Sequence, residues 1–595
     1  MGFEVTALQA FLLVLLAASG FLAVSGWLRT DLLGLSVLFV LAISGLLTPQ
    51  EAFVGFSSPA VITLAGLFIL TEAMNGAGFV HWLAARVTKW SGRSEAAVTA
   101  VFILVGATLS LFVNTAAAGA VLLPAVVSVA GQRKISPSKL LLPMGFGVIV
   151  GGTATIFTTA NIIMSGLLQS QGHHGLTLMD FFPTGWALVV VTLLYFLAGG
   201  SKLLPDISLT QHRGLNSSDL TEIYSMKERM WELEVDGDSP LDGRTLEDIE
   251  LGVPVLAIWR GKKAEFSPGA ESQVHGGDIL LVSASRDDFQ GFRDSKLTVG
   301  RDRQIGERDI PVVMVEAVIP PRSSAVGKTL VDLNFQKRHG LTVVALWRGG
   351  ESHRDEIGTM ALRAGDALLM VGTVQKAVEL TKNPDYLVVD TPHNPPLSSS
   401  KSALTLLITA GVLAAAGLGL TSMSLAAFSG ALLLVLLKVM KPEEAYSAID
   451  WRVLFLIAGM FPMAKAMEKT GLTAVFSDLF SQVFAGQSPI IPVAAVYLFT
   501  VLATQIVGGQ VSALFTGPVA LSMAGEFGID PKAVAVLVGI ACSNCFITSI
   551  AHPVNLLVSG PGGYKAKDFV KVGSLLQVLC FLTAMGMAHY YWGIG

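Results

Sequence analysis

The feature that most constrains this chain is a polar interruption in the middle of a long apolar segment. Residues 151–161 read Gly-Gly-Thr-Ala-Thr-Ile-Phe-Thr-Thr-Ala-Asn, and they lie between the apolar runs Leu140–Val150 and Ile162–Leu168. A helix of roughly 20 apolar residues crosses a membrane, but lipid-facing helices favour Leu, Ile and Val over glycine and hydroxyl side chains. We interpret the segment as a membrane helix broken near its middle, where protein, water or a ligand must satisfy the free backbone groups.

The same pattern occurs again in the second half of the chain. Asn161-Ile-Ile recurs as Asn555-Leu-Leu, 394 positions later, and the second copy follows a similarly polar stretch at residues 542–554. Pro124 matches Pro518 at the same offset. A nearly constant offset indicates a duplicated membrane unit, and paired broken helices at corresponding places indicate the binding site of a secondary transporter.

The composition restricts the chain to membrane proteins. Of its 595 residues, 52% are hydrophobic and 14% are charged, which is too apolar for a soluble enzyme of this length. The three cysteines lie in apolar segments and predict no disulfide framework. The sequence contains no recognisable metal-ligand cluster, catalytic triad or phosphate loop, so we expect no enzyme activity. The expected partners are the lipid bilayer and a small inorganic anion, and they do not include nucleic acid.

We predict a polytopic α-helical membrane protein with an inverted repeat, two re-entrant hairpins, two broken helices and an inserted cytosolic α+β tandem domain. The predicted domains are a first membrane repeat, two small soluble domains, a Pro/Ser linker and a second membrane repeat, at residues 1–201, 202–300, 301–390, 391–401 and 402–595. The predicted spans are 6–26, 31–47, 59–74 and 184–200, then 402–417, 424–439, 453–467 and 569–591. The predicted hairpins are 96–130 and 490–524, and the predicted broken helices are 139–168 and 533–558.

Basic residues predict how the chain is oriented, because Lys and Arg favour cytoplasmic loops. With the N-terminus outside, the basic clusters at residues 86–93, 133–139, 438–452 and 565–571 and the soluble insert all fall on the cytoplasmic side. Each half then crosses the membrane five times, so the two repeats have opposite topology. We expect a multi-pass protein of the cell membrane with both termini outside.

The soluble insert contains a duplication of its own. Gly243-Arg-Thr-Leu recurs as Gly327-Lys-Thr-Leu, and Gly277-Asp-Ile-Leu-Leu recurs as Gly365-Asp-Ala-Leu-Leu. The pattern resembles the TrkA C-terminal (RCK-type) regulatory domain, which often occurs in pairs on ion transport proteins. Two interpretations stay open. Residues 202–390 either stabilise the structure or the dimer, or they bind a small cytosolic regulator that biases the transport cycle.

The predicted site consists of neutral polar groups. Across residues 105–125, 145–165, 503–524 and 540–562 there is no Asp, Glu, Lys or Arg, and His552 is the only imidazole. A proton-coupled cation exchanger usually needs a buried carboxylate, so the sequence disfavours one. Neutral oxygens at a helix break suit sodium, and half-helix N-termini suit an anion. We therefore predict co-transport of sodium, the only metal expected, with a small oxyanion.

The candidate residues come from the hairpin tips and the breaks. The predicted substrate ligands are Asn114, Thr115, Thr158, Thr159, Gly508, Gly509, Gln510, Ser512, His552 and Pro553. The predicted sodium ligands are Asn114, Gly151, Thr153, Thr155, Asn161, Ser512, Ser543, Asn544, Thr548, Ser549 and Asn555. Each has a structural alternative: hydroxyl side chains can bond back to their own helix, glycines can serve only helix packing, and His552 can be a satisfied polar residue beside a proline.

These motifs resemble the divalent anion/sodium symporter family (solute carrier family 13 type) of the ion transporter superfamily. The resemblance rests on Asn114-Thr115 with Pro124, on Gly151-Gly-Thr through Asn161, and on Pro553-Val-Asn followed by Gly-Pro-Gly-Gly-Tyr. It implies homodimers in which a transport domain that carries both hairpins moves through a fixed scaffold, an elevator mechanism, with one sodium site beside each tip.

One departure from the family pattern bears on the substrate. Dicarboxylate-carrying members have Ser-Asn-Thr at both tips, whereas residues 113–115 are Val-Asn-Thr and residues 507–509 are Val-Gly-Gly. Bacterial and algal members with paired TrkA C-terminal domains resemble sulfate transporters, so sulfate is the first choice. The alternatives are a di- or tricarboxylate symporter, a transport-like membrane sensor, and an arsenite or cation exporter of the same superfamily.

Overall fold

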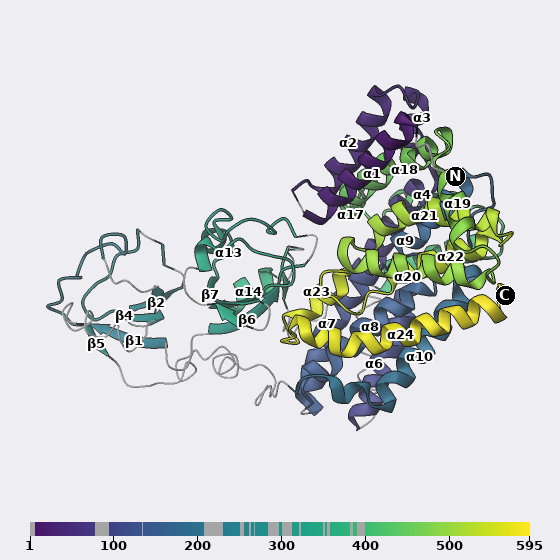
Figure 1. The fold of residues 1–595 in the computed structure, drawn as a ribbon. Coiled ribbons are helices and arrows are strands. Elements are labelled where there is room, and N and C mark those ends of the chain that lie inside the picture. Colours follow the sequence, from purple (N-terminus) through teal and green to yellow (C-terminus); the bar gives the residue numbers. More distant parts are fainter. Residues whose placement is uncertain are drawn as a thin grey trace.

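The structure, a computed structural model, consists of a large helical body and two five-stranded β-sheets (Figure 1). The predicted linker at residues 391–401 and the basic cluster at 86–93 lie largely outside the described residues. The structure describes residues 6–25, 27–77, 94–133, 135–206, 230–249, 255–260, 263–266, 268–269, 271–283, 297–299, 312–320, 323–348, 351–353, 357–380, 383, 385–388 and 399–595.

The helical body is built from two successive series of helices. The first series is α1 (Ala7–Ser25), α2 (Thr30–Ile43), α3 (Pro49–Phe53), α4 (Pro59–Gly76), α6 (Glu95–Ser110), α7 (Thr115–Arg133), α8 (Pro137–Thr153), α9 (Thr159–Ser170) and α10 (Leu178–Ala198). The second series is α15 (Ser399–Gly417), α16 (Met423–Leu436), α17 (Pro442–Ala448), α18 (Trp451–Lys469), α19 (Leu472–Val483), α20 (Ile490–Val507), α21 (Gly509–Glu526), α22 (Pro531–Ser543), α23 (Pro553–Ser559) and α24 (Ala566–Tyr590).

The two series contact each other through equivalent pairs of helices. Helix α2 packs on α18, and α16, its counterpart in the second series, packs on α4. Small residues allow both crossings: a Cβ on Gly459 would lie 2.3 Å from the backbone of Gly34, and one on Gly66 would lie 2.6 Å from that of Ala427. Gly34 corresponds to Ala427 and Gly66 corresponds to Gly459, each at an offset of 393, so each contact is the counterpart of the other, as expected for a duplicated unit. Their opposite orientation in a membrane stays a prediction.

Several helices suit a membrane. Among the described residues, four are long and apolar enough to cross it alone, or five if the bent pair α17 and α18, at 58°, is one span. Helices α1, α2, α6, α7, α15, α16 and α22 are apolar but shorter, whereas α20, half of the second predicted hairpin, is one of the four long helices. Helix α10 begins at Leu178, before the predicted start at residue 184, because Thr177 and Asp180 form a capping box. The amphipathic helix α19 was missed because its polar face interrupts the apolar run.

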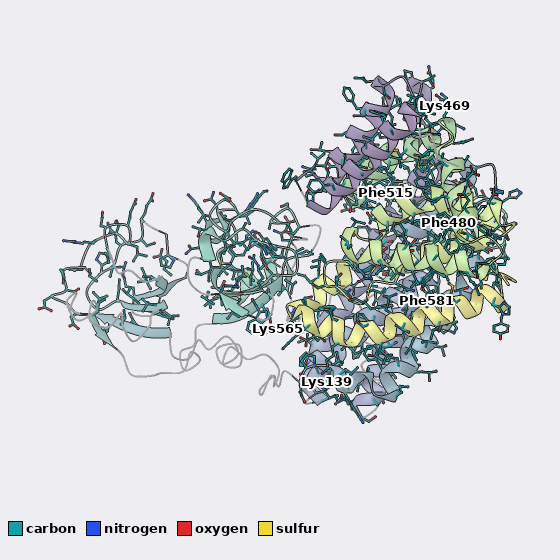
Figure 2. The ribbon with its side chains drawn as sticks, viewed as in Figure 1. Lys139, Lys469, Phe480, Phe515, Lys565 and Phe581 are labelled. Atoms are coloured by element: carbon teal, nitrogen blue, oxygen red, sulfur yellow. The ribbon has the colours of Figure 1, made fainter. Side chains whose placement is uncertain are left out.

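Lysine side chains join neighbouring segments by hydrogen bonds at both ends of the helical body. Figure 2 shows Lys139 and Lys565 near the end that faces the sheets, away from Lys469. The Lys139 Nζ donates to the carbonyl oxygens of Ser201 (3.3 Å) and Leu204 (3.2 Å). The two predicted cytoplasmic lysines thus lie toward the same side as the sheets.

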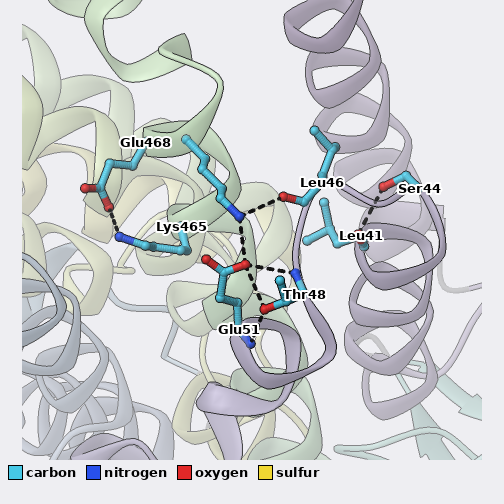
Figure 3. Close-up of polar contacts among 8 residues, drawn as sticks. Leu41, Ser44, Leu46, Thr48, Glu51, Lys465 and Glu468 are labelled. Carbon is cyan, nitrogen blue, oxygen red and sulfur yellow. Dashed lines mark hydrogen bonds and ion pairs between the residues drawn. The ribbon is translucent and has the colours of Figure 1, made fainter.

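At the other end, Lys469 of α18 joins the two series (Figure 3). Its Nζ donates to the Glu51 carboxylate (2.7 Å) and to the Leu46 carbonyl (3.4 Å). The same Glu51 oxygen accepts from the Thr48 backbone N–H at 2.8 Å, which closes a capping box on α3. One carboxylate therefore caps a helix of the first series and pairs with a lysine of the second.

The two sheets have the same strand order. The first sheet contains β1 (Met230–Val235), β2 (Val255–Arg260), β3 (Lys263–Phe266), β4 (Ile279–Ser283) and β5 (Leu297–Val299) in the order β3-β2-β4-β1-β5. The second contains β6 (Val312–Val318), β7 (Thr342–Arg348), β8 (Glu351–His353), β9 (Ala367–Thr373) and β10 (Leu387–Val388) in the equivalent order β8-β7-β9-β6-β10, with α13 (Phe335–His339) and α14 (Val374–Leu380) beside it. All described strand pairs are antiparallel.

An equivalent ion pair stabilises each sheet. Arg260 donates two hydrogen bonds to the buried Asp278, at 3.0 and 2.7 Å. Arg348 likewise donates to Asp366, at 2.8 and 2.5 Å. Both carboxylates follow a glycine with positive φ, at Gly277 and Gly365. The internal repeat seen in the sequence therefore corresponds to two copies of one strand arrangement with one conserved side-chain network.

Candidate functional site

The first break separates α8 from α9 at residues 154–158, inside the predicted segment. Asn161 closes it, because its side-chain Nδ2 donates to the Thr155 carbonyl oxygen at 2.6 Å. The hydroxyl groups of Thr153 and Thr155 donate to the carbonyl oxygens of Val150 (2.6 Å) and Leu111 (3.4 Å). Asn161 is fully buried, and its Oδ1 has no hydrogen-bond partner within the described part of the chain.

The second break separates α22 from α23 at residues 544–552 and uses the same device. The Asn555 Nδ2 donates to the carbonyl oxygens of Cys545 (2.7 Å) and Thr548 (3.1 Å). Gln505 of α20 supports the loop, since its Oε1 accepts from the Thr548 backbone N–H at 3.3 Å. Asn161 and Asn555 therefore hold equivalent breaks, each with its amide nitrogen bound and its amide oxygen unpaired among the described residues.

The two hairpin tips lie against the breaks. At the first tip, the Asn114 Oδ1 caps α7 by accepting from the Ala116 N–H at 2.9 Å. At the second, Gly508 has φ +80°, which favours glycine, and a Cβ on Gly509 would lie 2.2 Å from the Cys542 carbonyl oxygen. The second tip therefore needs both glycines to lie against the end of α22, whatever else they bind.

One cavity of about 1410 Å³ joins both tips and both breaks. It is lined by nine of the ten predicted substrate residues, namely Asn114, Thr115, Thr158, Thr159, Gly508, Gly509, Gln510, His552 and Pro553. Ser512, the tenth, is fully buried behind the wall. Residues from distant parts of two duplicated halves thus converge on one space, as the sequence predicts for a transport site.

The cavity also has charged residues that sequence reasoning placed elsewhere or missed. Glu72, Asp385, Glu443, Glu444, Asp450 and Lys401 line it together with the sheet residues Pro320, Asn383, Tyr386 and Leu387. Glu72, Glu443 and Glu444 are exposed, so they mark the open end, which we call the mouth. The tips and breaks themselves carry no carboxylate, and we call that part the inner cavity. Glu72 lies near the end of the predicted span 59–74, and it also lines the cavity.

The predicted sodium ligands differ in their positions. The side chains of Asn114 and Thr155 are hydrogen-bonded, and Asn114 and Ser543 line the cavity. Gly151 instead packs so tightly on α6 that a Cβ would lie 2.3 Å from Ala107. Thr548 donates to the Gln505 carbonyl at 3.0 Å, and Ser549 is partly exposed in the second break.

Behind the wall lie buried oxygen atoms with no hydrogen-bond partner among the described residues. They are the Oδ1 atoms of Asn161, Asn544 and Asn555 and the Oγ of Ser512. The Asn544 Nδ2 donates to the Tyr497 hydroxyl at 2.7 Å, so its oxygen is also the free end. Buried acceptors without donors are costly, and oxygen atoms of this kind are the ligands that hard cations prefer. Within the described residues there is no cluster of His, Cys, Asp and Glu that suits a transition metal.

Comparison with known proteins is consistent with this site. The family model described as citrate transporter (CitMHS) matches residues 20–541. An uncharacterized transporter of Synechocystis sp. is 30% identical over 583 residues, covering 96% of this chain and 94% of the relative. An uncharacterized transporter of Escherichia coli is 29% identical over 602 residues, covering 97% and 98%. Sodium/sulfate cotransporter 2 of Chlamydomonas reinhardtii is 25% identical over 279 residues, covering 46% of this chain and 32% of the relative.

Proposed function

The chain belongs to the citrate transporter family and is a membrane transporter, and we propose that it couples the uptake of a small divalent oxyanion to sodium, with sulfate as first choice. The observation that carries the proposal is the inner cavity, where two hairpin tips and two helix breaks meet without a carboxylate. A charged substrate in such a place needs a co-transported ion of opposite charge, because an unpaired charge within a membrane is costly.

The buried oxygens support sodium as that ion. Asn161 and Asn555 each have an amide oxygen without a donor among the described residues, and their amide nitrogens bond the backbone carbonyls of Thr155 and Cys545 in the breaks. Hard cations prefer oxygen ligands of this kind. The name of the Chlamydomonas reinhardtii relative, a sodium/sulfate cotransporter, agrees with this choice.

The donors on the cavity wall support an anion. Thr159 at the start of α9 and Gly509 at the start of α21 line the cavity, so two helix N-termini lie at the inner cavity, and the Thr158 hydroxyl lacks a partner among the described residues. His552 contributes as well. Its Nδ1 accepts from the Val554 N–H at 3.2 Å, so a neutral ring carries its proton on Nε2 and can donate it to an oxyanion.

The remaining parts of the proposal follow from the resemblance to the symporter family. The two halves form an inverted repeat of five crossings each, with the two sheets as TrkA-C-like domains in the cytosol. Two copies form a homodimer, and the hairpins move as an elevator against a fixed scaffold. The position of Lys139 and Lys565 toward the sheets agrees with this orientation (Figure 2).

Uptake of labelled sulfate into proteoliposomes tests the coupling. We expect uptake to require an inward sodium gradient and to saturate with sulfate. Uptake that is unchanged when potassium replaces sodium would refute the coupling, and binding without counterflow would identify a sensor instead of a transporter. Competition by citrate or succinate, but not by sulfate or thiosulfate, would identify a carboxylate carrier, as the family description suggests.

A matched pair of variants tests the site. Thr158→Val removes a buried hydroxyl from a residue that lines the inner cavity, and Thr99→Val removes a buried hydroxyl from α6, whose described residues do not line the cavity; neither hydroxyl has a partner among the described residues. We expect Thr158→Val to raise the sulfate KM roughly tenfold, the value of one hydrogen bond to a charged group. Thr99→Val should transport like the unmodified protein. An equal effect of both substitutions would remove the inner cavity from the binding site.

A further inference from the structure

A turn of the second sheet touches the helical body. This turn, residues 363–367, lies between η4 (Ile357–Thr359) and β9, and it contains Gly365 with φ +86°. A Cβ on Gly365 would lie 2.7 Å from the carbonyl oxygen of Leu556 in α23. A Cβ on Gly560, just after α23, would lie 2.7 Å from the Gly365 carbonyl oxygen. The two backbones are therefore in direct contact.

Apolar packing extends this contact. Val318 of β6 and Ala367 of β9 are fully buried and belong to the same continuous core as Leu557 and Val558 of α23. Such burial joins the sheet to the helix that carries Asn555, the residue that closes the second break. Movement of α23 away from its position would expose this apolar surface to water, which is unfavourable.

The same sheet also walls the mouth of the cavity. Asn383, Asp385, Tyr386 and Leu387 line it on one side, while Gly508 and His552 line the inner cavity. The cavity is therefore bounded jointly by the helical body and by a soluble domain. Anything that leaves the inner cavity on this side passes the segment around β10.

The first sheet provides an internal comparison. Gly277 occupies the turn equivalent to Gly365, with φ +83°, and the ion pair of Arg260 and Asp278 matches that of Arg348 and Asp366. A Cβ on Gly277 would meet nothing within 4 Å. The turn itself is common to both sheets, whereas the contact with a broken helix belongs to the second sheet alone among the described residues.

We propose that the second sheet domain, residues 312–388, is a lid: it holds α23 and covers the cavity mouth, so cargo passes on this side only after the domain separates from α23. The lid rests on the contacts above, and the identity of the cargo rests on the proposed function. The first sheet domain makes no such contact through its described residues, and we do not assign this role to it.

A labelling experiment tests the lid without any substrate. The reporter is Ala120→Cys, on the cavity wall in α7, in a full-length chain that also carries Cys542→Ser so that the native cavity cysteine does not react. Gly365→Ala and Gly277→Ala are compared in this background, because both place a Cβ on a positive-φ turn but only one meets α23. We expect Gly365→Ala to accelerate labelling by a water-soluble methanethiosulfonate several-fold, and Gly277→Ala to leave it unchanged. Equal rates in all three proteins, or acceleration by both substitutions, would overturn the lid.

A disulfide tests whether the domain must separate. A Cβ on Gly560 would lie 3.5 Å from the Cβ of Ala367, within the range of disulfide geometry. We expect the double variant Ala367→Cys with Gly560→Cys to lose sulfate uptake on oxidation and to regain it on reduction, while each single variant is insensitive. Full uptake in the cross-linked protein would overturn the lid. Absence of uptake from the reduced protein and from the unmodified chain would instead refute the proposed substrate, and the labelling result would still decide the lid.

Discussion

The sharpest prediction concerns Gly539, which lies beside the proposed sodium ligand Asn161 and is not itself a proposed ligand. A Cβ on Gly539 of α22 would lie 2.6 Å from the Oδ1 of Asn161, well inside van der Waals contact. Gly539→Ala must therefore displace this oxygen. Overpacking of this kind costs about 1–3 kcal/mol, and the better helix propensity of alanine offsets about 1 kcal/mol of it. If Asn161 binds sodium, loss of one ligand weakens sodium binding by about 1.5–3 kcal/mol, which is roughly 10- to 100-fold.

The duplicated chain supplies the control. Gly145 of α8 is the equivalent position, 394 residues earlier, and a Cβ there would lie 3.3 Å from a methyl group of Val554, which can adjust. The assay is the sodium dependence of the unfolding temperature of the purified protein, since a bound ion stabilises the folded state. We expect the sodium concentration for half-maximal stabilisation to rise in Gly539→Ala and to stay unchanged in Gly145→Ala. Equal sodium dependence in the two variants would refute the assignment of Asn161.

Three further changes test other parts of the structure. Tyr564→Phe removes a buried hydroxyl that donates to one backbone carbonyl of α8 at 2.6 Å and accepts from one N–H at 2.9 Å, so we expect a loss of about 1–3 kcal/mol in the free energy of unfolding, seen as a lower Tm. Burial, and then the charge of Arg338, lower the pKa of His339. The folded state therefore disfavours the protonated ring, so the free energy of unfolding should be full above the unfolded pKa of about 6.5 and fall as the pH drops below it. Hydrogen exchange of β9, corrected for intrinsic rates, should show this loss in the unmodified chain and not in His339→Phe. Glu443→Gln with Glu444→Gln should lower the sulfate KM measured from the sheet side, an effect that disappears at high salt because both groups are exposed.

The positions of the breaks and tips could be predicted because duplication marks them. Asn161 and Asn555 occur at one offset within polar interruptions, and an interruption in a membrane helix has few structural explanations. The structure brings both breaks to one cavity. What the sequence did not reveal is that each asparagine bonds its own loop through nitrogen and leaves its oxygen without a partner among the described residues, because this depends on backbone geometry within the break.

The two glycines of the second hairpin tip meet packing requirements and also line the cavity. Gly508 and Gly509 were expected either to expose N–H groups to an anion or to serve helix packing. The φ of +80° at Gly508 and the contact of Gly509 with the Cys542 carbonyl oxygen are packing requirements. Both residues nevertheless line the cavity, although the Gly508 N–H already donates to the Thr504 carbonyl oxygen at 3.0 Å.

The charges at the mouth could not be predicted from the site segments, because they come from elements far away in the sequence. Asp385 lies in the soluble domain, and Glu443 and Glu444 lie on α17, outside the predicted hairpins and broken helices. A pattern search within the broken helices therefore finds a carboxylate-free site, which is correct for the inner cavity. Only the fold shows that a soluble domain contributes to the wall.

The two parts of the cavity act differently on an anion and on sodium. The inner cavity presents donors beside free oxygens, whereas the mouth has five carboxylates and one ammonium group, that of Lys401. At an exposed site, two unit charges 4 Å apart interact by about 1 kcal/mol, and the interaction is screened beyond about 8–10 Å. If the cargo is the proposed oxyanion, it meets a modest repulsion where the cavity opens toward the sheets, and sodium meets a modest attraction. If the proposed lid is also correct, its closure leaves less water between the carboxylates and the anion and strengthens the repulsion, so separation of the domain from α23 and discharge of the anion would favour each other.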